Sequence, residues 1–186
     1  VSGKGVTASL IMATCRSVLR AKASDNHSPS EVMKGVNELI FPDIREDMFV
    51  TMAYLILDRH SNEVTMARAG HNAPFHYHHK TKTVEQLEPI GMALGIDSGG
   101  VFERIVKDFT FQLESGDILL LYTDGVNEAL NANGDEFGMQ KIEDSILRHA
   151  DETAEKIVTR LSREVHAFIG NIDQSDDITL IAIKKA

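Results

Sequence analysis

The sequence predicts an α+β fold, in which helices and hairpin-linked strands occupy separate stretches of the chain. Two stretches with helical spacing come first, short strands bounded by turns follow, and a long helix and one strand come last. This order lacks the strand–helix alternation of a parallel sheet. The 186 residues suit one domain, assigned to residues 1–186, and 42% hydrophobic content is typical of a packed core.

The helices are predicted from apolar spacing and from capping residues. The first begins at Val6, where apolar residues start to recur at helical intervals. In the second, Ser28 is the expected N-cap, Pro29 the first helical residue and Glu31 the capping-box partner. Its expected core stripe consists of Val32, Val36, Leu39 and Ile40. A long helix is predicted over residues 153–169, ended by Gly170.

The strands are predicted from period-two alternation and from short apolar runs. Residues 49–57 are apolar on both faces, which favours a central strand, and residues 63–69 alternate as the returning strand of a hairpin. Further strands are predicted over residues 75–77, 84–87, 109–113, 118–122 and 178–183. The loop 96–100 is expected to be the most flexible point.

Composition excludes several classes of protein. The net charge of −9 argues against nucleic acid or an anionic membrane as the main partner. The single cysteine, Cys15, allows no internal disulfide and is expected to be a buried, inert thiol. No apolar run approaches the roughly 20 residues of a membrane span, and no signal peptide is expected. These features predict a cytoplasmic protein without direct membrane contact.

Three aspartates stand at turns beside apolar strands. Asp124 follows one strand directly, and Asp176 and Asp177 precede the last strand. Carboxylate oxygens are the ligands that Mg²⁺ and Mn²⁺ prefer. The same residues are also common in turns, and spacing alone cannot show that the two turns meet. The residues by themselves therefore leave a metal site and plain turns as alternatives.

Two other groups of residues are candidates for binding a ligand. His71, His76, His78 and His79 lie close in sequence and could bind zinc, but solvated histidines at a hairpin end are the favoured interpretation. The segment 3–5, Gly-Lys-Gly, lacks the spacing and the preceding strand of a phosphate-binding loop.

An ordered series of motifs resembles the PPM superfamily, the protein phosphatase 2C-like enzymes, and more narrowly its bacterial SpoIIE-type branch. Residues 1–5 resemble the end of the family's Asp-Val-Ser-Gly-Lys-Gly motif. The remaining blocks are MFVTM at 48–52, AGHNAP at 69–74, PIGMALG at 89–95, GDILLLYTDGV at 116–126 and SDDITL at 175–180. The blocks run in family order along nearly the whole chain, which makes the resemblance specific.

The resemblance implies an α-β-β-α sandwich of two antiparallel sheets flanked by helices, with the first strands missing. It also implies two Mn²⁺ or Mg²⁺ ions bridged by a water that attacks the phosphate. Asp124, Asp176 and the backbone carbonyl of Val1 match metal-ligand positions. Second-shell or phosphate contacts are expected at Ser2, Lys4, Gly125 and Asp177.

The sequence departs from the family pattern at its first residue. The family's bridging aspartate would directly precede Val1, so a chain beginning at Val1 is expected to be inactive alone. Ser2 stands where eukaryotic relatives carry a histidine proposed as general acid. The SpoIIE-type branch commonly lacks that histidine.

The resemblance predicts a protein serine/threonine phosphatase of bacterial sigma-factor signalling. Its expected substrate is a phosphoserine on a STAS-type anti-sigma-factor antagonist, and its expected neighbour in the same polypeptide is a sensor or receiver domain. A homodimer through exposed apolar helix faces or an unpaired sheet edge is a further expectation. The alternative is a non-catalytic pseudophosphatase that binds a partner, and a nucleotidyl or cyclic-nucleotide enzyme is a weaker third interpretation.

Overall fold

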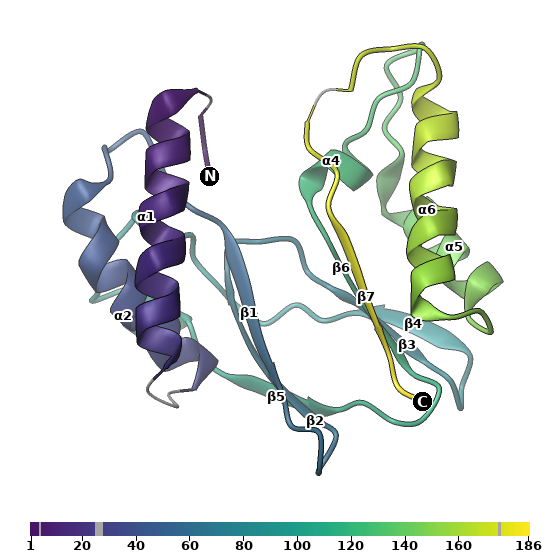
Figure 1. Cartoon of the computed structure of the whole chain (residues 1–186), viewed down its shortest axis with the longest axis horizontal. Coiled ribbons are helices and arrows are strands. Elements are labelled where there is room, and N and C mark those ends of the chain that lie inside the picture. The colour runs from purple at the N-terminus through teal and green to yellow at the C-terminus, as the bar shows by residue number, and fades with distance from the viewer. Residues whose placement is uncertain (4, 25–27, 175) are drawn as a thin grey trace. The chain divides into compact units, whose positions relative to one another are not determined.

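The computed structural model describes residues 1–3, 5–24, 28–174 and 176–186, and the chain forms two compact units. The first unit comprises residues 1–71 and 89–112, and the second comprises residues 72–88 and 113–186. Each unit contains helices and one antiparallel sheet, as Figure 1 shows. The predicted α+β class with two antiparallel sheets is confirmed.

The first unit packs helices against a three-stranded sheet with the strand order β1-β2-β5. Both pairings are antiparallel, and Met66 of β2 lies opposite Leu55 on one side and Phe109 on the other. The elements are α1 (Val6–Ala23), α2 (Pro29–Ile40), a 3₁₀ turn (Phe41–Asp43), β1 (Met52–Leu57), β2 (Glu63–Ala69), α3 (Phe102–Ile105) and β5 (Phe109–Gln112).

Helix α2 begins as the sequence predicts and buries most of the predicted stripe. The Ser28 hydroxyl accepts from the backbone NH of Glu31, and the Glu31 carboxylate accepts from the backbone NH of Ser28. Leu39, which was expected in the core, is half exposed, whereas Met33 is buried. The buried face of α2 and β2 share one core, formed by Val32, Met33, Val36, Ile40, Ala67 and Ala69.

The strand predicted over residues 49–57 was expected to be central, and the structure corrects this expectation. Among the described strands, β1 lies at an edge, begins only at Met52, and is half buried or exposed along its length. The central position belongs to β2, which is mostly buried. Before β1, Val50 pairs with Leu94 in an isolated bridge. An apolar run indicates a strand, but it does not give the position of that strand in the sheet. The strand order depends on pairing partners that are remote in sequence.

The loop 96–100 is fastened to the rest of the first unit, contrary to its expected flexibility. The Asp97 carboxylate accepts from the backbone NH groups of Gly99, Val101 and Phe102, at 2.8–3.0 Å. The buried Asn37 of α2 bonds both the carbonyl of Asp97 and the NH of Gly95, at 2.9 Å each. These NH contacts lower the pKa of Asp97, those of Phe102 and Gly99 most.

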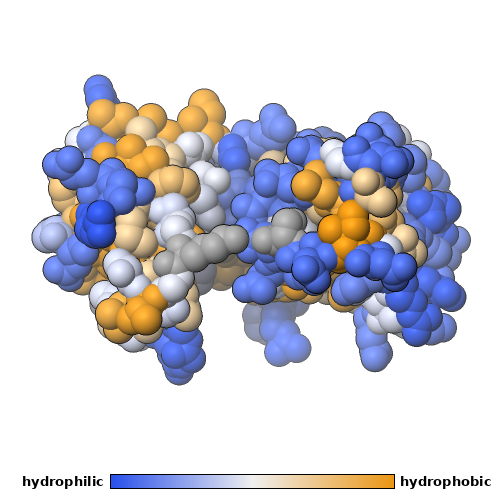
Figure 2. Space-filling view, turned by 90° about the horizontal axis from the view of Figure 1, so that it is seen from above, coloured by the Kyte–Doolittle hydropathy of each residue, from blue (hydrophilic) through white to orange (hydrophobic). Residues whose placement is uncertain are grey.

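Helix α1 exposes apolar side chains. Val6 and Leu10 are 77% and 63% exposed, and Met12 is half exposed. Figure 2 shows hydrophobic surface on the side of the molecule that carries α1 and α2. In contrast, Cys15 is buried, as predicted.

The second unit packs two helices against one face of a four-stranded sheet with the order β4-β3-β6-β7. Phe75 and Tyr77 of β3 enter this core, so His76 and His78 point to the opposite face. The elements are β3 (Phe75–His78), β4 (Thr83–Gln86), β6 (Ile118–Tyr122), α4 (Asp124–Asn127), α5 (Gly138–His149), α6 (Ala154–Ile169) and β7 (Leu180–Lys184).

Helix α6 follows the prediction closely, with Thr153 as N-cap and Gly170 as C-cap. Helix α5 was not predicted, because its buried apolar positions are only Ile142 and Ile146. No helix in the described ranges is long and apolar enough to cross a membrane.

Candidate metal centre

The two aspartate-bearing turns meet at one end of the second unit's sheet. Strands β6 and β7 run antiparallel, with Tyr122 opposite Leu180. The residue after the end of β6 therefore lies beside the residues before β7. Asp124 begins the short helix α4 at this position, and Asp176 and Asp177 lie on the approach to β7. The two turns therefore lie side by side, which sequence spacing alone could not show.

Thr123 fastens the two segments together. Its hydroxyl donates to the carbonyl of Asp177 at 2.9 Å and accepts from the backbone NH of Thr179 at 2.9 Å. The backbone NH of Thr123 also donates to the carbonyl of Thr179 at 3.2 Å. A single side chain therefore fixes the aspartate of one turn against the backbone of the other.

Gly125 allows the two segments to approach this closely. A Cβ atom on Gly125 would lie 2.5 Å from the carbonyl oxygen of Asp177 and 3.2 Å from that of Asp176. Real Cβ atoms do not come as near as the first distance. Gly125 is expected as a second-shell residue or phosphate contact, and the structure shows it in close backbone packing beside Asp176 and Asp177.

The aspartate side chains are exposed and held by their neighbours' backbone. Oδ1 of Asp124 accepts from the NH of Gly125 at 3.0 Å, and Oδ1 of Asp176 accepts from the NH of Asp177 at 2.7 Å. Asp177 accepts the hydrogen bond from Thr123 with its backbone carbonyl and not with its carboxylate.

A pocket of about 250 Å³ opens at this junction. Three of its lining side chains are carboxylates, those of Glu128, Glu136 and Asp176, and Gly125 and Leu130 complete it. The two glutamates were not predicted as site residues. Their convergence depends on the bridge between Leu130 and Glu136, which sequence spacing does not reveal. A donor set of carboxylate oxygens fits hard cations such as Mg²⁺ and Mn²⁺.

Val1 and Ser2 belong to the first unit. The Ser2 hydroxyl accepts from the backbone NH of Phe49 at 2.7 Å, and the Ser2 NH donates to the Phe49 carbonyl at 2.9 Å. This pairing holds the N-terminal segment along residues 48–50. Val1 is 40% exposed, and Lys4 lies outside the described residues.

The histidine group differs from its expected solvated state. His76 is only 2% exposed, and its Nε2 lies 3.1 Å from Oδ2 of the buried Asp117. Burial is the main cause that lowers the pKa of His76, and the nearby His78 adds to it. Burial raises the pKa of Asp117, but bonds from the NH groups of His79 and Glu114 and from His76 outweigh it and lower that pKa.

The fold is that of protein phosphatase 2C-like (PP2C) domains. The SiaA-PP2C domain of Pseudomonas aeruginosa superposes with a TM-score of 0.82 at 18% identity, covering 100% of this chain and 72% of that one. The structure of RsbX in complex with magnesium superposes with a TM-score of 0.68 at 16% identity, covering 97% and 75%. At such identities the likeness concerns the fold.

The sequence narrows this class to one family. Residues 1–186 match the family described as Stage II sporulation protein E (SpoIIE), and the chain belongs to that family. It is 31% identical over 188 residues to phosphoserine phosphatase RsbU of Bacillus subtilis, covering 100% of this chain. The chain spans 53% of the length of RsbU.

Proposed function

We propose that this chain is the catalytic part of a metal-dependent protein serine/threonine phosphatase. The observation that carries the proposal is the joining of Asp124 to Asp176 and Asp177 through Thr123 and Gly125. Carboxylates from both segments, Glu128 and Asp176, line one pocket beside Gly125. The similarity to phosphoserine phosphatase RsbU along the whole chain supports the same activity.

In this proposal Asp124 and Asp176 hold Mn²⁺ or Mg²⁺, two ions in the intact domain. The ions would supply an activated water and neutralise charge on the phosphoryl oxygens. Thr123 and Gly125 position the two carboxylates, and Glu128 and Glu136 add negative potential that attracts cations. The crystal structure of RsbX in complex with magnesium supports a divalent cation in this fold.

We propose the backbone carbonyl of Val1 as a further ligand, with the family's aspartate directly before Val1 as the bridging carboxylate. Because this carboxylate would hold both ions, we propose that residues 1–186 without it are inactive. Lys4 and Ser2 are proposed to lie near the phosphate, with Ser2 also holding Phe49.

The proposed substrate is a phosphoserine on a small regulatory protein, a STAS-type anti-sigma-factor antagonist. The similarity to RsbU, named a phosphoserine phosphatase, supports phosphoserine as the group that is hydrolysed. A sensor or receiver domain in the same polypeptide is proposed as the input. The exposed Val6, Leu10 and Met12 on α1 support a homodimer contact, which light scattering would detect.

The test measures Mn²⁺-dependent phosphate release from a phosphoserine protein and from p-nitrophenyl phosphate. It compares the protein from its native start, the chain of residues 1–186, and full-length Asp176→Asn and Asp151→Asn. Asp151 is an exposed control near the far end of β7, where Lys184 bonds the neighbouring carbonyls of Ala150 and Glu152. We expect Asp176→Asn to lower activity by about 100-fold or more and Asp151→Asn to leave it unchanged.

Inactivity of every form, with the fold intact and Mn²⁺ present, would contradict the phosphatase. A protein that still bound its phosphorylated partner would then be the non-catalytic binding module. Activity of residues 1–186 alone would contradict the expected requirement for the preceding aspartate.

A further inference from the structure

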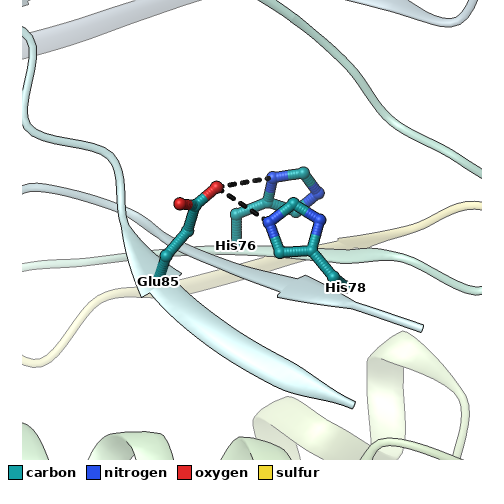
Figure 3. Close-up of side chains that lie close together, drawn as sticks. All are labelled: His76, His78 and Glu85. Atoms are coloured by element: carbon teal, nitrogen blue, oxygen red, sulfur yellow. Dashed lines mark hydrogen bonds and ion pairs between the residues drawn. The ribbon is translucent and has the colours of Figure 1, made fainter. Parts of the chain in front are cut away.

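Two histidines and a glutamate converge on the β3–β4 hairpin of the second unit. His76 and His78 are two residues apart on β3, so their side chains leave the same face. Glu85 of β4 lies directly opposite His76 in the register of the hairpin. Figure 3 shows the Glu85 carboxylate directed at both imidazole rings.

The three side chains have the spacing of metal ligands. Oε1 of Glu85 lies 2.8 Å from Nε2 of His78 and 3.9 Å from Nδ1 of His76. One ligand atom from each residue lies within 4.8 Å of the other two. A tetrahedral zinc ion with bonds of about 2.0–2.1 Å separates its ligand atoms by roughly 3.3 Å. Small side-chain shifts would therefore bring all three onto one ion.

Asp117 orients His76 for this role. Oδ1 of Asp117 accepts from the NH of His79 at 2.8 Å, and Oδ2 accepts from the NH of Glu114 at 3.0 Å. Because both carboxylate oxygens act as acceptors, we assign the ring proton of His76 to Nε2, which lies 3.1 Å from Oδ2. Nδ1 then carries the lone pair on the side of Glu85. Zinc-binding histidines commonly donate their other ring NH to a carboxylate in this way.

We propose that His76, His78 and Glu85 form a second metal site, for Zn²⁺. Two imidazole nitrogens and one carboxylate suit zinc, whereas the carboxylates around Asp124 and Asp176 suit Mg²⁺ and Mn²⁺. Three protein ligands leave one coordination position for water. The side chains of His78 and Glu85 are 35% and 55% exposed, so the ion can enter from solvent.

The ion would connect β3 to β4, an edge strand among those described. The backbone pairing between β3 and β4 is short and comprises four residue pairs. Zinc that binds only the folded state would raise the melting temperature of the second unit.

The experiment titrates the metal-free chain with Zn²⁺ by isothermal calorimetry and repeats the titration with Mg²⁺. The variants are His78→Ala and Glu85→Gln, which change partly exposed side chains and spare the buried His76. The controls are His60→Ala, at an exposed turn of the first unit, and Asp176→Asn, in the candidate metal centre beside β6 and β7. Co²⁺ serves as a spectroscopic probe, because tetrahedral nitrogen–oxygen coordination gives an intense visible spectrum.

We expect one Zn²⁺ per chain, a higher melting temperature with Zn²⁺, and affinity reduced by at least about 10–100-fold in His78→Ala and Glu85→Gln. His60→Ala and Asp176→Asn should keep wild-type affinity for Zn²⁺. Absence of Zn²⁺ binding, or equal affinity in all variants, would overturn the proposal and leave a hydrogen-bonded network. Neither result depends on phosphatase activity.

Discussion

The carbonyl oxygen of Asp177 lies where a side chain on Gly125 would begin, 2.5 Å from an ideal Cβ position. This contact joins the end of β6 to the segment before β7. It allows the carboxylates of Asp124 and Asp176 to share one end of the sheet. The same glycine therefore determines both local packing and the arrangement of the proposed ligands.

Gly125→Ala should separate the two segments. The methyl group meets backbone atoms, which cannot rotate away, so we expect a loss of about 1–3 kcal/mol in the free energy of unfolding. Weaker Mn²⁺ binding should accompany this loss. Urea unfolding and calorimetry measure the two effects.

Gly100→Ala is the matched control for this substitution. A Cβ atom on Gly100 meets nothing within 4 Å, so its effect on stability should stay within about 0.5 kcal/mol. Equal effects of the two substitutions would contradict the proposed role of the Gly125–Asp177 contact.

The Asp97 carboxylate should make stability depend on pH at the acid end. Its pKa is lowered below the ordinary value of 3.8, chiefly by the NH groups of Phe102 and Gly99. The ionised group therefore contributes stability that is fully present above pH 3.8 and lost as pH falls through the folded-state pKa.

Asp97→Asn tests this dependence because it keeps an acceptor oxygen and removes the charge. Urea unfolding of both proteins at about pH 6 and about pH 3 should show a stability difference that shrinks at the lower pH. A difference that stays constant would show that the charge of Asp97 contributes nothing.

Neighbouring residues at the end of α2 should differ sharply in their effect on stability. Ile40 is 1% exposed in the core shared with β2, whereas Leu39 is 50% exposed. Ile40→Ala should cost about 2–5 kcal/mol and Leu39→Ala less than about 1 kcal/mol, measured by thermal or urea unfolding. Similar losses would place Leu39 in a contact that the structure does not show.

The sequence allowed the candidate aspartates to be predicted, but it did not show that they lie close together in the fold. Asp124 and Asp176 were identified from turns and motifs, yet their meeting depends on the antiparallel pairing of β6 with β7. Glu128 and Glu136 were not predicted because they line a pocket from segments without the regular hydrophobic spacing of a helix or strand. His76 was misjudged as solvated, because alternation shows which face a residue occupies but not what covers that face.

The sequence by itself determined the local structure: the capping box of α2, the C-cap of α6, the alternating strands and the family motifs. Such features depend on residues a few positions apart, whose interactions are the same in any fold. Only the tertiary structure decided that β1 lies at an edge among the described strands and that Gly125 contacts Asp177. It also decided that Glu85 faces two histidines. These relationships join residues remote in sequence, and the packing of the complete sheet selects among many pairings that the local pattern permits.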